Sequence, residues 1–262
     1  MNAILLAAGV GVRLAPYTDD HPKCLVEIAG QSLLERHLDI LCELVDGVTL
    51  VVGYRDGQIR DAVGTWKART RHPIPVEFVY NEDYERGSIL SLHAARAVLL
   101  REDTVVMDAD VLYGPALMER LLQSSHANCF LLDDSASESG EEMMVCVREG
   151  RAVHIARSHD PSTQSGWDLT GEGVGFFKLD RGDAAAVVAI LDEMIAGGAC
   201  DGEYEEGLAR FMATHRCGFE SVSDLPWTEI DFKEDIQHAN RVVMEKLLDP
   251  RPDRPNLSIV GD

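Results

Sequence analysis

Residues 7–25 read AAGVGVRLAPYTDDHPKCL and follow directly on an apolar run, residues 4–6. A strand that ends in a glycine-containing loop lets backbone N–H groups approach phosphate oxygens with no side chain in the way. Arg13 and Lys23 lie in the same loop, and their charges would neutralise those phosphates. The stretch therefore predicts a nucleoside triphosphate site at the end of the first strand.

Two better-known phosphate loops do not fit this stretch. Leu14 stands where the dinucleotide fingerprint has its third glycine, and the Gly-Lys-Ser/Thr ending of a Walker loop is missing. A lone Gly-x-Gly pattern after a strand is also typical of a tight strand-to-helix turn. The cations at Arg13 and Lys23 favour the phosphate interpretation over the turn alone.

Composition limits the class of protein. The 262 residues are 45% hydrophobic and 26% charged, which is typical of a soluble globular chain. A net charge of −21 disfavours nucleic acid and anionic membrane as partners. No apolar run approaches the roughly 20 residues of a membrane helix, and the first strand follows Met1 too closely for a signal peptide. Six scattered cysteines without a CxxC pair predict reduced thiols and a cytoplasmic location.

Apolar strand patterns alternate with helical patterns in the first half of the chain. The expected strands are residues 2–7, 48–52, 76–80 and 104–107. The expected helices are residues 32–44, 56–66, 88–100 and 114–123. Ser32 and Glu35 form a capping box at the first of these helices. Such alternation predicts right-handed crossovers onto a mostly parallel sheet.

After residue 127 the pattern changes to strands with short connections. Expected strands are residues 129–132, 143–147, 152–155 and 174–179, with loops at 133–142 and 159–171 and helices at 183–195, 204–213 and 233–248. The predicted fold class is α/β, a Rossmann-like mixed, mostly parallel sheet flanked by helices. We expect one domain, residues 1–248, with a nucleotide-binding half of about 1–126 and an acceptor-binding half of about 127–248. Residues 249–262 contain three prolines and are expected to be extended or disordered.

Two carboxylates end the apolar run at residues 105–107. Asp108 and Asp110 are two residues apart, so on an ideal strand they would point the same way. Ligands in open α/β sheets lie at the carboxyl ends of the strands, and paired carboxylates there can hold Mg²⁺. The alternative is an Asx turn before the helix near Gly114.

A further carboxylate, Asp231, follows a short strand within residues 227–232, WTEIDF. It precedes the last expected helix, and acidic residues favour the positive end of a helix dipole. That simpler explanation suits Glu234 and Asp235 better than Asp231. Asp231 is therefore a second candidate metal ligand.

The whole string Ala-Ala-Gly-x-Gly-x-Arg-Leu, with Pro16, Thr18 and residues 22–25, resembles the signature of the sugar-phosphate nucleotidyltransferase superfamily, whose fold is GT-A-like. The Asp-Ala-Asp strand end and the Glu-Ile-Asp before the last helix resemble its CTP:phosphocholine cytidylyltransferase branch. Further matches to that branch are Asn81, Tyr84, Ser91-Leu92, residues 171–176 and residues 204–208. The resemblance covers about residues 2–245.

The resemblance implies a role for each matching residue. Asp110 and Asp231 would be the metal ligands, with Mg²⁺ as the cofactor, and Asp108 would support the metal or contact the substrate. Arg13 would bind the β- and γ-phosphates and Lys23 the α-phosphate. The nucleotide would also be held by Leu6, Ala8, Gly9, Gly11, Asn81, Ser88 and Asp108. Many relatives have a lysine near position 157, where this chain has Arg157.

The implied reaction is nucleotidyl transfer. An acceptor phosphate or phosphonate oxygen would attack the α-phosphorus of CTP and displace pyrophosphate, with positioning and charge neutralisation supplying most of the catalysis. Candidate acceptor-binding residues are Arg157, Glu172, Tyr204, Glu205 and Trp227; Phe176, Trp167 and Glu206 are further sources of rings and charge. Rings favour a quaternary ammonium such as phosphocholine, and carboxylates favour an aminoalkyl group such as 2-aminoethylphosphonate. A neutral polyol phosphate, such as an inositol or sugar phosphate, is a third possible acceptor.

Three functions are therefore weighed. The first is a Mg²⁺-dependent cytidylyltransferase acting on a small phosphorylated or phosphonate head group. The second is a uridylyl- or guanylyltransferase acting on a sugar 1-phosphate or an inositol phosphate. The third is a non-catalytic nucleotide-sensing domain. The presence together of the four proposed catalytic residues, Arg13, Lys23, Asp110 and Asp231, argues against it. The sequence leaves the oligomeric state open and is compatible with a homodimer.

Overall fold

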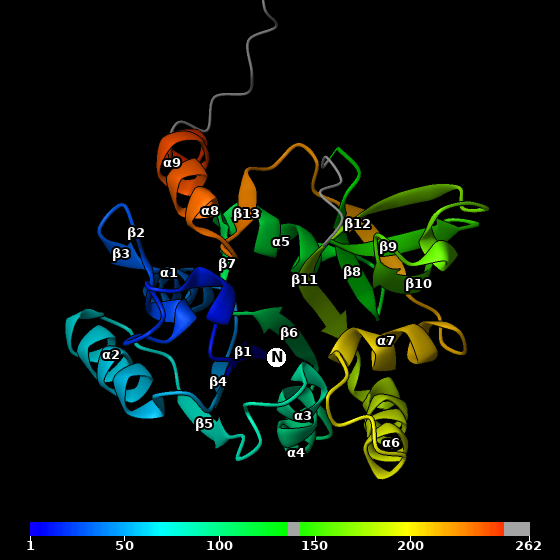
Figure 1. Cartoon of the computed structure of the whole chain (residues 1–262), viewed down its shortest axis with the longest axis horizontal. Helices are drawn as coiled ribbons and strands as arrows, with labels where there is room; N and C mark the ends of the chain where they lie inside the picture. Colours follow the sequence, from blue (N-terminus) through cyan, green and yellow to red (C-terminus); the bar gives the residue numbers. More distant parts are fainter. Residues whose placement is uncertain (136–141, 249–262) are drawn as a thin grey trace, which may run out of the picture.

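The computed structural model describes residues 1–135 and 142–248. A nine-stranded sheet lies at its centre (Figure 1), in the order β10-β9-β11-β6-β1-β4-β5, while β8 pairs with β11 and β12 with β8. The strands are β1 Asn2–Ala7, β4 Gly47–Val52, β5 Val76–Tyr80, β6 Thr104–Asp108, β8 Cys129–Asp133, β9 Met143–Arg148, β10 Arg151–Arg157, β11 Leu169–Leu179 and β12 Gly218–Ser221. Strands β6, β1, β4 and β5 are parallel neighbours, and β11 runs antiparallel to β6, β8 and β9. The expected mixed, mostly parallel sheet is confirmed.

Helices cover both faces of the sheet (Figure 1). The helices on the two faces are α1 Leu33–Leu41, α2 Asp56–Arg69, α3 Ser88–Ala94, α4 Arg96–Leu99, α5 Pro115–Gln123, α6 Arg181–Ala196 and α7 Tyr204–Met212. Two further helices, α8 Lys233–His238 and α9 Met244–Leu248, follow near the C-terminal end of the described chain. Side chains alternate along a strand, so Leu5 of β1 packs in the core with α1, α2 and α5, whereas Ile4 packs in the core with α3, α4, α6 and α7. Because both faces are buried, the central strands are almost continuously apolar.

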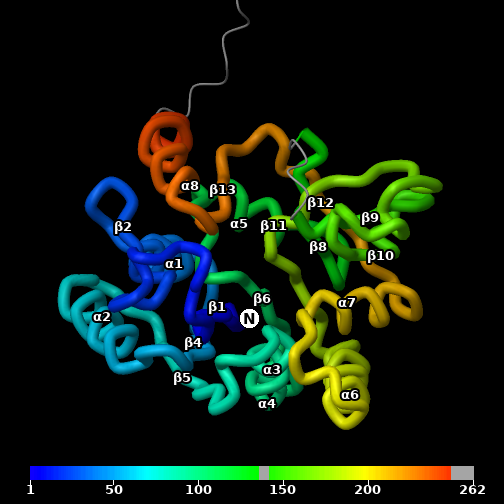
Figure 2. The backbone as a smooth tube through the Cα atoms, in the orientation of Figure 1, coloured from blue at the N-terminus to red at the C-terminus, as the bar shows by residue number. Residues whose placement is uncertain are grey.

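The chain returns to its own beginning at its C-terminal end. Figure 2 shows the segment of α8 and α9 lying beside the loop and short hairpin that follow β1, and the hairpin strands are β2 Glu27–Ile28 and β3 Gln31–Ser32. Leu14 of the loop shares a small buried cluster with Ile230 and Val243. The backbone N–H of Ala29 also donates to Asn240 Oδ1 at 2.8 Å. This return places residue 231 next to the loop that opened the sequence.

Several expected elements need correction. The helix expected at 88–100 tightens at Ala95 (φ −80°, ψ 5°) and divides into α3 and α4. The loop expected at 159–171 ends earlier, because Leu169 already pairs with Val147 of β9. The expected final helix is interrupted by a π-helical turn, Ala239–Val243. The capping box of Ser32 and Glu35 is confirmed, although α1 ends at Leu41.

Two further short strands pair with each other outside the central sheet. β7 Val111–Tyr113 pairs with β13 Trp227–Glu229, and together they hold residue 231 near the end of β6. Positions 136–141 of the predicted acidic loop and the whole of the predicted tail, positions 249–262, lie outside the described residues. In the described part of the chain, no helix is both long and apolar enough to cross a bilayer.

Candidate active site

The loop after β1 is shaped by one glycine. Gly11 has φ +69°, a left-handed conformation that side chains disfavour, and a Cβ there would lie 3.1 Å from Lys23 Cβ and 3.2 Å from Thr18 Cγ2. Two 3₁₀ turns follow, Val12–Leu14 and Lys23–Leu25. The loop therefore folds back on itself and brings Lys23 beside the glycine.

Hydrogen bonds to backbone carbonyls fix the outer part of this loop. Thr18 is buried, and its Oγ1 donates to the Gly11 carbonyl at 2.7 Å. The Tyr54 hydroxyl, from the segment after β4, donates to the Asp19 carbonyl at 2.7 Å. Because Tyr54 and Asp19 are 35 residues apart, tertiary structure rather than the loop alone holds this conformation.

An open cleft of about 760 Å³ lies between this loop and the end of β6. Its lining includes seven residues predicted to bind a nucleotide: Leu6, Ala8, Gly9, Gly11, Lys23, Ser88 and Asp108. Asp110, a predicted metal ligand, lines it as well. The fold thus gathers most of the predicted nucleotide site into one cleft, which we term the nucleotide cleft.

Two predicted nucleotide residues lie outside that lining. Asn81 is buried, and its Nδ2 donates to Ser91 Oγ at 3.0 Å, so it contacts a residue of the cleft wall. Arg13 lines a neighbouring pocket instead. Tyr84 and Arg86 also line the cleft, and neither is a predicted nucleotide residue. Tyr84 only matches the family pattern, and nothing in the local sequence distinguishes Arg86.

Lys23 links the two predicted metal ligands. Its Nζ lies 2.6 Å from Asp110 Oδ2 and also donates to Asp231 Oδ1. Burial lowers the pKa of Lys23, but the facing carboxylates Asp110 and Asp231 outweigh burial and raise that pKa above its ordinary value. Arg13 Nη2 lies 2.8 Å from the other oxygen of Asp231. Two cations from the N-terminal loop thus meet two carboxylates from distant parts of the chain.

The expectation that Asp108 and Asp110 share one face of a strand is wrong. β6 ends at Asp108, and Ala109–Asp110 form a turn. The carboxylates consequently have different partners: Asp110 accepts from Lys23, whereas Asp108 Oδ2 accepts from the Tyr204 hydroxyl at 2.8 Å. Gly175 (φ +77°) makes room for Asp108, since a Cβ at position 175 would lie 2.3 Å from Asp108 Oδ2.

The carboxylates around Lys23 suit a divalent cation. Asp110, Glu229 and Asp231 each offer one oxygen, and these oxygens lie within 4.8 Å of one another. Asp110 Oδ1 is buried and has no hydrogen-bond partner among the described residues. An all-oxygen donor set with an unsatisfied buried oxygen is what a hard cation such as Mg²⁺ prefers. Glu229 was not predicted as a ligand from the sequence. Its position two residues before Asp231 is the sequence feature that could have indicated it.

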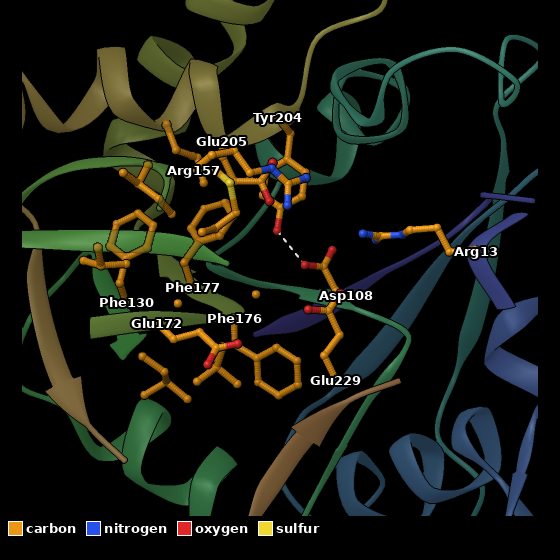
Figure 3. Close-up of a pocket in the computed structure, with 18 residues that line it drawn as sticks. Arg13, Asp108, Phe130, Arg157, Glu172, Phe176, Phe177, Tyr204, Glu205 and Glu229 are labelled. Atoms are coloured by element: carbon orange, nitrogen blue, oxygen red, sulfur yellow. Dashed lines mark hydrogen bonds between the residues drawn. The ribbon is translucent and has the colours of Figure 1, made fainter. Parts of the chain in front are cut away.

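A second pocket, of about 680 Å³, adjoins the nucleotide cleft and shares Asp108 with it (Figure 3). Four of the five predicted acceptor residues line it: Arg157, Glu172, Tyr204 and Glu205. Figure 3 shows Arg13 reaching toward it from the side opposite Arg157 and Glu205. Phe130, Phe176 and Phe177 form an aromatic wall of this pocket. Of these three rings, only Phe176 was predicted from the sequence as a candidate for acceptor binding.

Three candidate acceptor residues lie elsewhere. Trp227 Nε1 donates to Asp133 Oδ2 at 2.9 Å, and Trp227 is outside the lining of both pockets. Trp167 packs instead against Arg148, whose guanidinium lies 4.5 Å from the ring centre. Glu206 accepts from the Glu203 backbone N–H at the start of α7. Indole rings are equally suited to packing and to ligand binding, which is why the sequence could not separate these uses.

The second pocket is rich in carboxyl groups with raised pKa values. Desolvation, reinforced by Glu142 and Asp133, raises the pKa of Glu172 to about 7. Desolvation also raises the pKa of Glu205 to about 7, with Glu203 adding to it and Arg157 and Tyr204 opposing it. A cation in the pocket would relieve this unfavourable burial of negative charge. The pocket is thus electrostatically suited to a positively charged group.

The pocket also contains guanidinium groups. Arg157 donates from Nε to Glu203 Oε2 at 3.2 Å, and Arg13 approaches from the nucleotide side. A guanidinium gives planar, two-point contact to phosphate or phosphonate oxygens. Carboxylates and guanidinium groups in one pocket suit a small zwitterion.

Comparison with known proteins places the chain in a family and gives several relatives. The model of a protein family described as 'MobA-like NTP transferase domain' matches residues 3–170 of this chain. A CTP:phosphoglutamine cytidylyltransferase of Campylobacter jejuni is 25% identical over 90% of this chain and 98% of its own. A CMP-5'-(3-aminopropyl)phosphonate synthase of Streptomyces rubellomurinus is 28% identical over 92% of this chain and 38% of its own. The solved CTP:phosphocholine cytidylyltransferase of Streptococcus pneumoniae superposes with a TM-score of 0.72 at 20% identity, covering 94% of this chain and 98% of that one.

Some curated relatives are longer than this chain. It spans about half the length, 52%, of a bifunctional IPC transferase and DIPP synthase of Aquifex aeolicus, which is 24% identical over 93% of this chain. The shared part is therefore one portion of those proteins.

Proposed function

Since the chain belongs to the MobA-like NTP transferase family, a family of nucleotidyltransferases, we propose that it is a cytidylyltransferase that transfers CMP from CTP to a small zwitterionic phosphate or phosphonate. The observation that carries this proposal is the carboxylate-rich second pocket, which shares Asp108 with the nucleotide cleft. Relatives whose names contain CTP or CMP support the choice of a cytidine nucleotide. Asp108 at the boundary would bring the two substrates together.

In the proposed reaction, an acceptor oxygen forms a bond to the α-phosphorus while the bond from that phosphorus to the bridging oxygen breaks. Pyrophosphate leaves with the bond electrons. No general base is required, because the attacking oxygen is already anionic. Lys23 would neutralise charge on the α-phosphate and Arg13 on the β- and γ-phosphates, so positioning and electrostatics do most of the work.

We further propose that Asp110 and Asp231, with Glu229 beside them, hold a divalent cation, with Mg²⁺ as the natural candidate. The cation would supply charge neutralisation on the phosphate oxygens. Lys23 donates to both aspartates, and because an ammonium has three N–H donors it can also donate to a phosphate. The same carboxylates would also serve the cation.

On the acceptor side, we propose that Glu172 and Glu205 receive the positive group and that Arg157 receives the phosphate or phosphonate. The aromatic wall of Phe130, Phe176 and Phe177 would contact a methylated ammonium favourably. A neutral sugar or inositol ring would leave these buried carboxylates without a counter-charge, at an energetic cost. Cationic acceptors are therefore preferred.

A pyrophosphate-release assay tests this function. CTP, UTP, GTP and ATP are each offered with Mg²⁺ against phosphocholine, 2-aminoethylphosphonate, inositol 1-phosphate and glucose 1-phosphate. We expect turnover with CTP and a cationic acceptor. Preference for UTP or GTP with a sugar or inositol phosphate would refute the cytidylyl assignment, and no turnover with any pair would favour a nucleotide-sensing domain.

Binding of the cationic group should strengthen as pH rises. Glu172 and Glu205 lose their protons near pH 7, so their negative charge is mostly absent at pH 6 and mostly present at pH 8. Choline keeps its charge throughout, and we expect its dissociation constant to fall by about tenfold between these values. Calorimetry with choline measures this, and Glu205→Gln should flatten the trend. Binding that is independent of pH in the unmodified protein would contradict the assignment.

A further inference from the structure

Two loops meet beside the pockets and form what we call the loop junction: residues 86–89, before and at the start of α3, and residues 200–204, before and at the start of α7. The Gly87 N–H donates to the Cys200 carbonyl at 3.0 Å, and the Ile89 N–H donates to the Gly202 carbonyl at 3.2 Å. The two segments are more than 100 residues apart in sequence, so this contact is made by tertiary structure.

Side chains strengthen the junction. Arg86 donates from Nε to Asp201 Oδ1 and from Nη2 to Asp201 Oδ2, both at 2.9 Å. This two-point geometry fixes orientation as well as distance. Ser88 Oγ accepts from the Tyr204 backbone N–H at 3.0 Å, at the first residue of α7.

The approach of the two backbones leaves no room for a side chain. A Cβ on Gly87 would lie 2.1 Å from the Gly202 carbonyl oxygen, and this neighbour is backbone, which cannot turn aside. Gly87 is therefore required for the contact itself.

The junction joins elements of the two pockets. Arg86 and Ser88 line the nucleotide cleft, whereas Tyr204 and Glu205 line the second pocket. The Tyr204 hydroxyl in turn donates to Asp108, which belongs to both. A continuous set of contacts thus runs from the nucleotide cleft, through the first turn of α7, back to the shared carboxylate.

The body of α7 has its own support. Leu208, Phe211 and Met212 are buried in the core, so the helix stays in place without the junction. What the junction determines is the position of the first turn, which carries Tyr204 and Glu205. Loss of the junction should therefore alter binding in the second pocket more than it alters the fold.

From this geometry, and resting on the function proposed above, we propose that Asp201 and Arg86 are positioning residues for the acceptor. Asp201 is outside the lining of both pockets and its side chain is 74% exposed, so it acts on the acceptor only through Arg86 and the 200–204 segment. The pair holds the first turn of α7 at the distance from the nucleotide cleft that the transfer needs.

Asp201→Ala provides the direct test, read by separate binding measurements with choline, ethanolamine and Mg²⁺-CTP. We expect the dissociation constant of the preferred head group to rise about tenfold, since small displacements of positioning groups have large effects. The dissociation constant of CTP should change less than about twofold, and the melting temperature should stay nearly constant because exposed ion pairs contribute little to stability. Asp201→Asn, which keeps a hydrogen-bond acceptor, should have an intermediate effect.

Asp224→Ala is the matched control. Asp224 forms a similar two-point pair with Arg120 and is 67% exposed, but neither residue lines the nucleotide cleft or the second pocket. It should leave both affinities unchanged. Gly87→Ala is a second, stronger variant, expected to weaken head-group binding by about 100-fold by forcing the loops apart.

The outcomes separate the two proposals. If the unmodified protein binds the head group and CTP but transfers nothing, the proposed function fails while the junction can still be judged by the binding shifts. If Asp201→Ala leaves head-group affinity unchanged, or weakens CTP binding by the same factor, the positioning role is overturned. If the unmodified protein binds neither choline nor ethanolamine, the acceptor role of the second pocket and the role of Asp201 fall together.

Discussion

Replacing Asp110 with asparagine is expected to reduce kcat/KM by about 1000-fold, because it removes charge from the proposed metal site, where phosphate charge would be neutralised. The side chains have nearly the same shape, so the turn after β6 should be preserved. Lys23 keeps a partner in Asp231, and the fold should therefore survive. Pyrophosphate release at saturating Mg²⁺ measures the loss, and circular dichroism checks the fold.

Binding of Mn²⁺, followed by its electron paramagnetic resonance, gives a second measurement for Asp110→Asn. Loss of a direct ligand is expected to weaken Mn²⁺ binding by more than about tenfold, since even outer partners of a metal matter to that degree. Asp192→Asn is the control, because Asp192 is a surface residue paired with His93. Unchanged turnover and Mn²⁺ affinity in Asp110→Asn would refute the metal assignment.

Replacing Lys23 with alanine should have opposite effects on turnover and on metal affinity. Turnover is expected to fall about 100-fold, because a cation next to the α-phosphate is lost. Mn²⁺ affinity without nucleotide is expected to rise at least about tenfold, because the ammonium that now contacts Asp110 and Asp231 no longer competes for their oxygens.

Thermal melting provides a further measurement for the same variant. Without Lys23 the carboxylates of Asp110, Glu229 and Asp231 repel one another, so the variant should melt at a lower temperature and recover when Mn²⁺ is added. Lys246→Ala, on the exposed side of α9, should change none of these quantities. A variant that loses turnover with no gain in Mn²⁺ affinity would show that Lys23 does not compete with the metal.

Local patterns accounted for most of the fold. The central strands could be predicted because both faces of the sheet are covered and their residues are almost all apolar, and α1 because Ser32 and Glu35 mark its start. The interruptions were missed: Ala95, where α3 gives way to α4, and the π-helical turn at Ala239–Val243 have no glycine or proline to mark them. The early start of β11 depends on pairing with β9, which is a long-range effect.

The nucleotide side of the candidate site was easier to predict from the sequence than the acceptor side. On the nucleotide side, the loop after β1 carries its glycines and cations within one short segment, and seven predicted residues line one cleft. On the acceptor side the lining comes from several distant strands and helices, so single residues gave little information. Trp227 was assigned there on residue type alone and packs elsewhere, whereas Glu229 was overlooked.

The sequence by itself determined that a buried strand is followed, at residues 7–25, by a loop that contains glycines and two cations, because these features are local and depend on residue type and spacing. Only the tertiary structure decided what faces that loop. Lys23 and Asp231 are separated by 208 positions, and their contact depends on the return of the C-terminal segment over the start of the chain. The second pocket and the loop junction likewise arise from packing between distant elements, which no local pattern records.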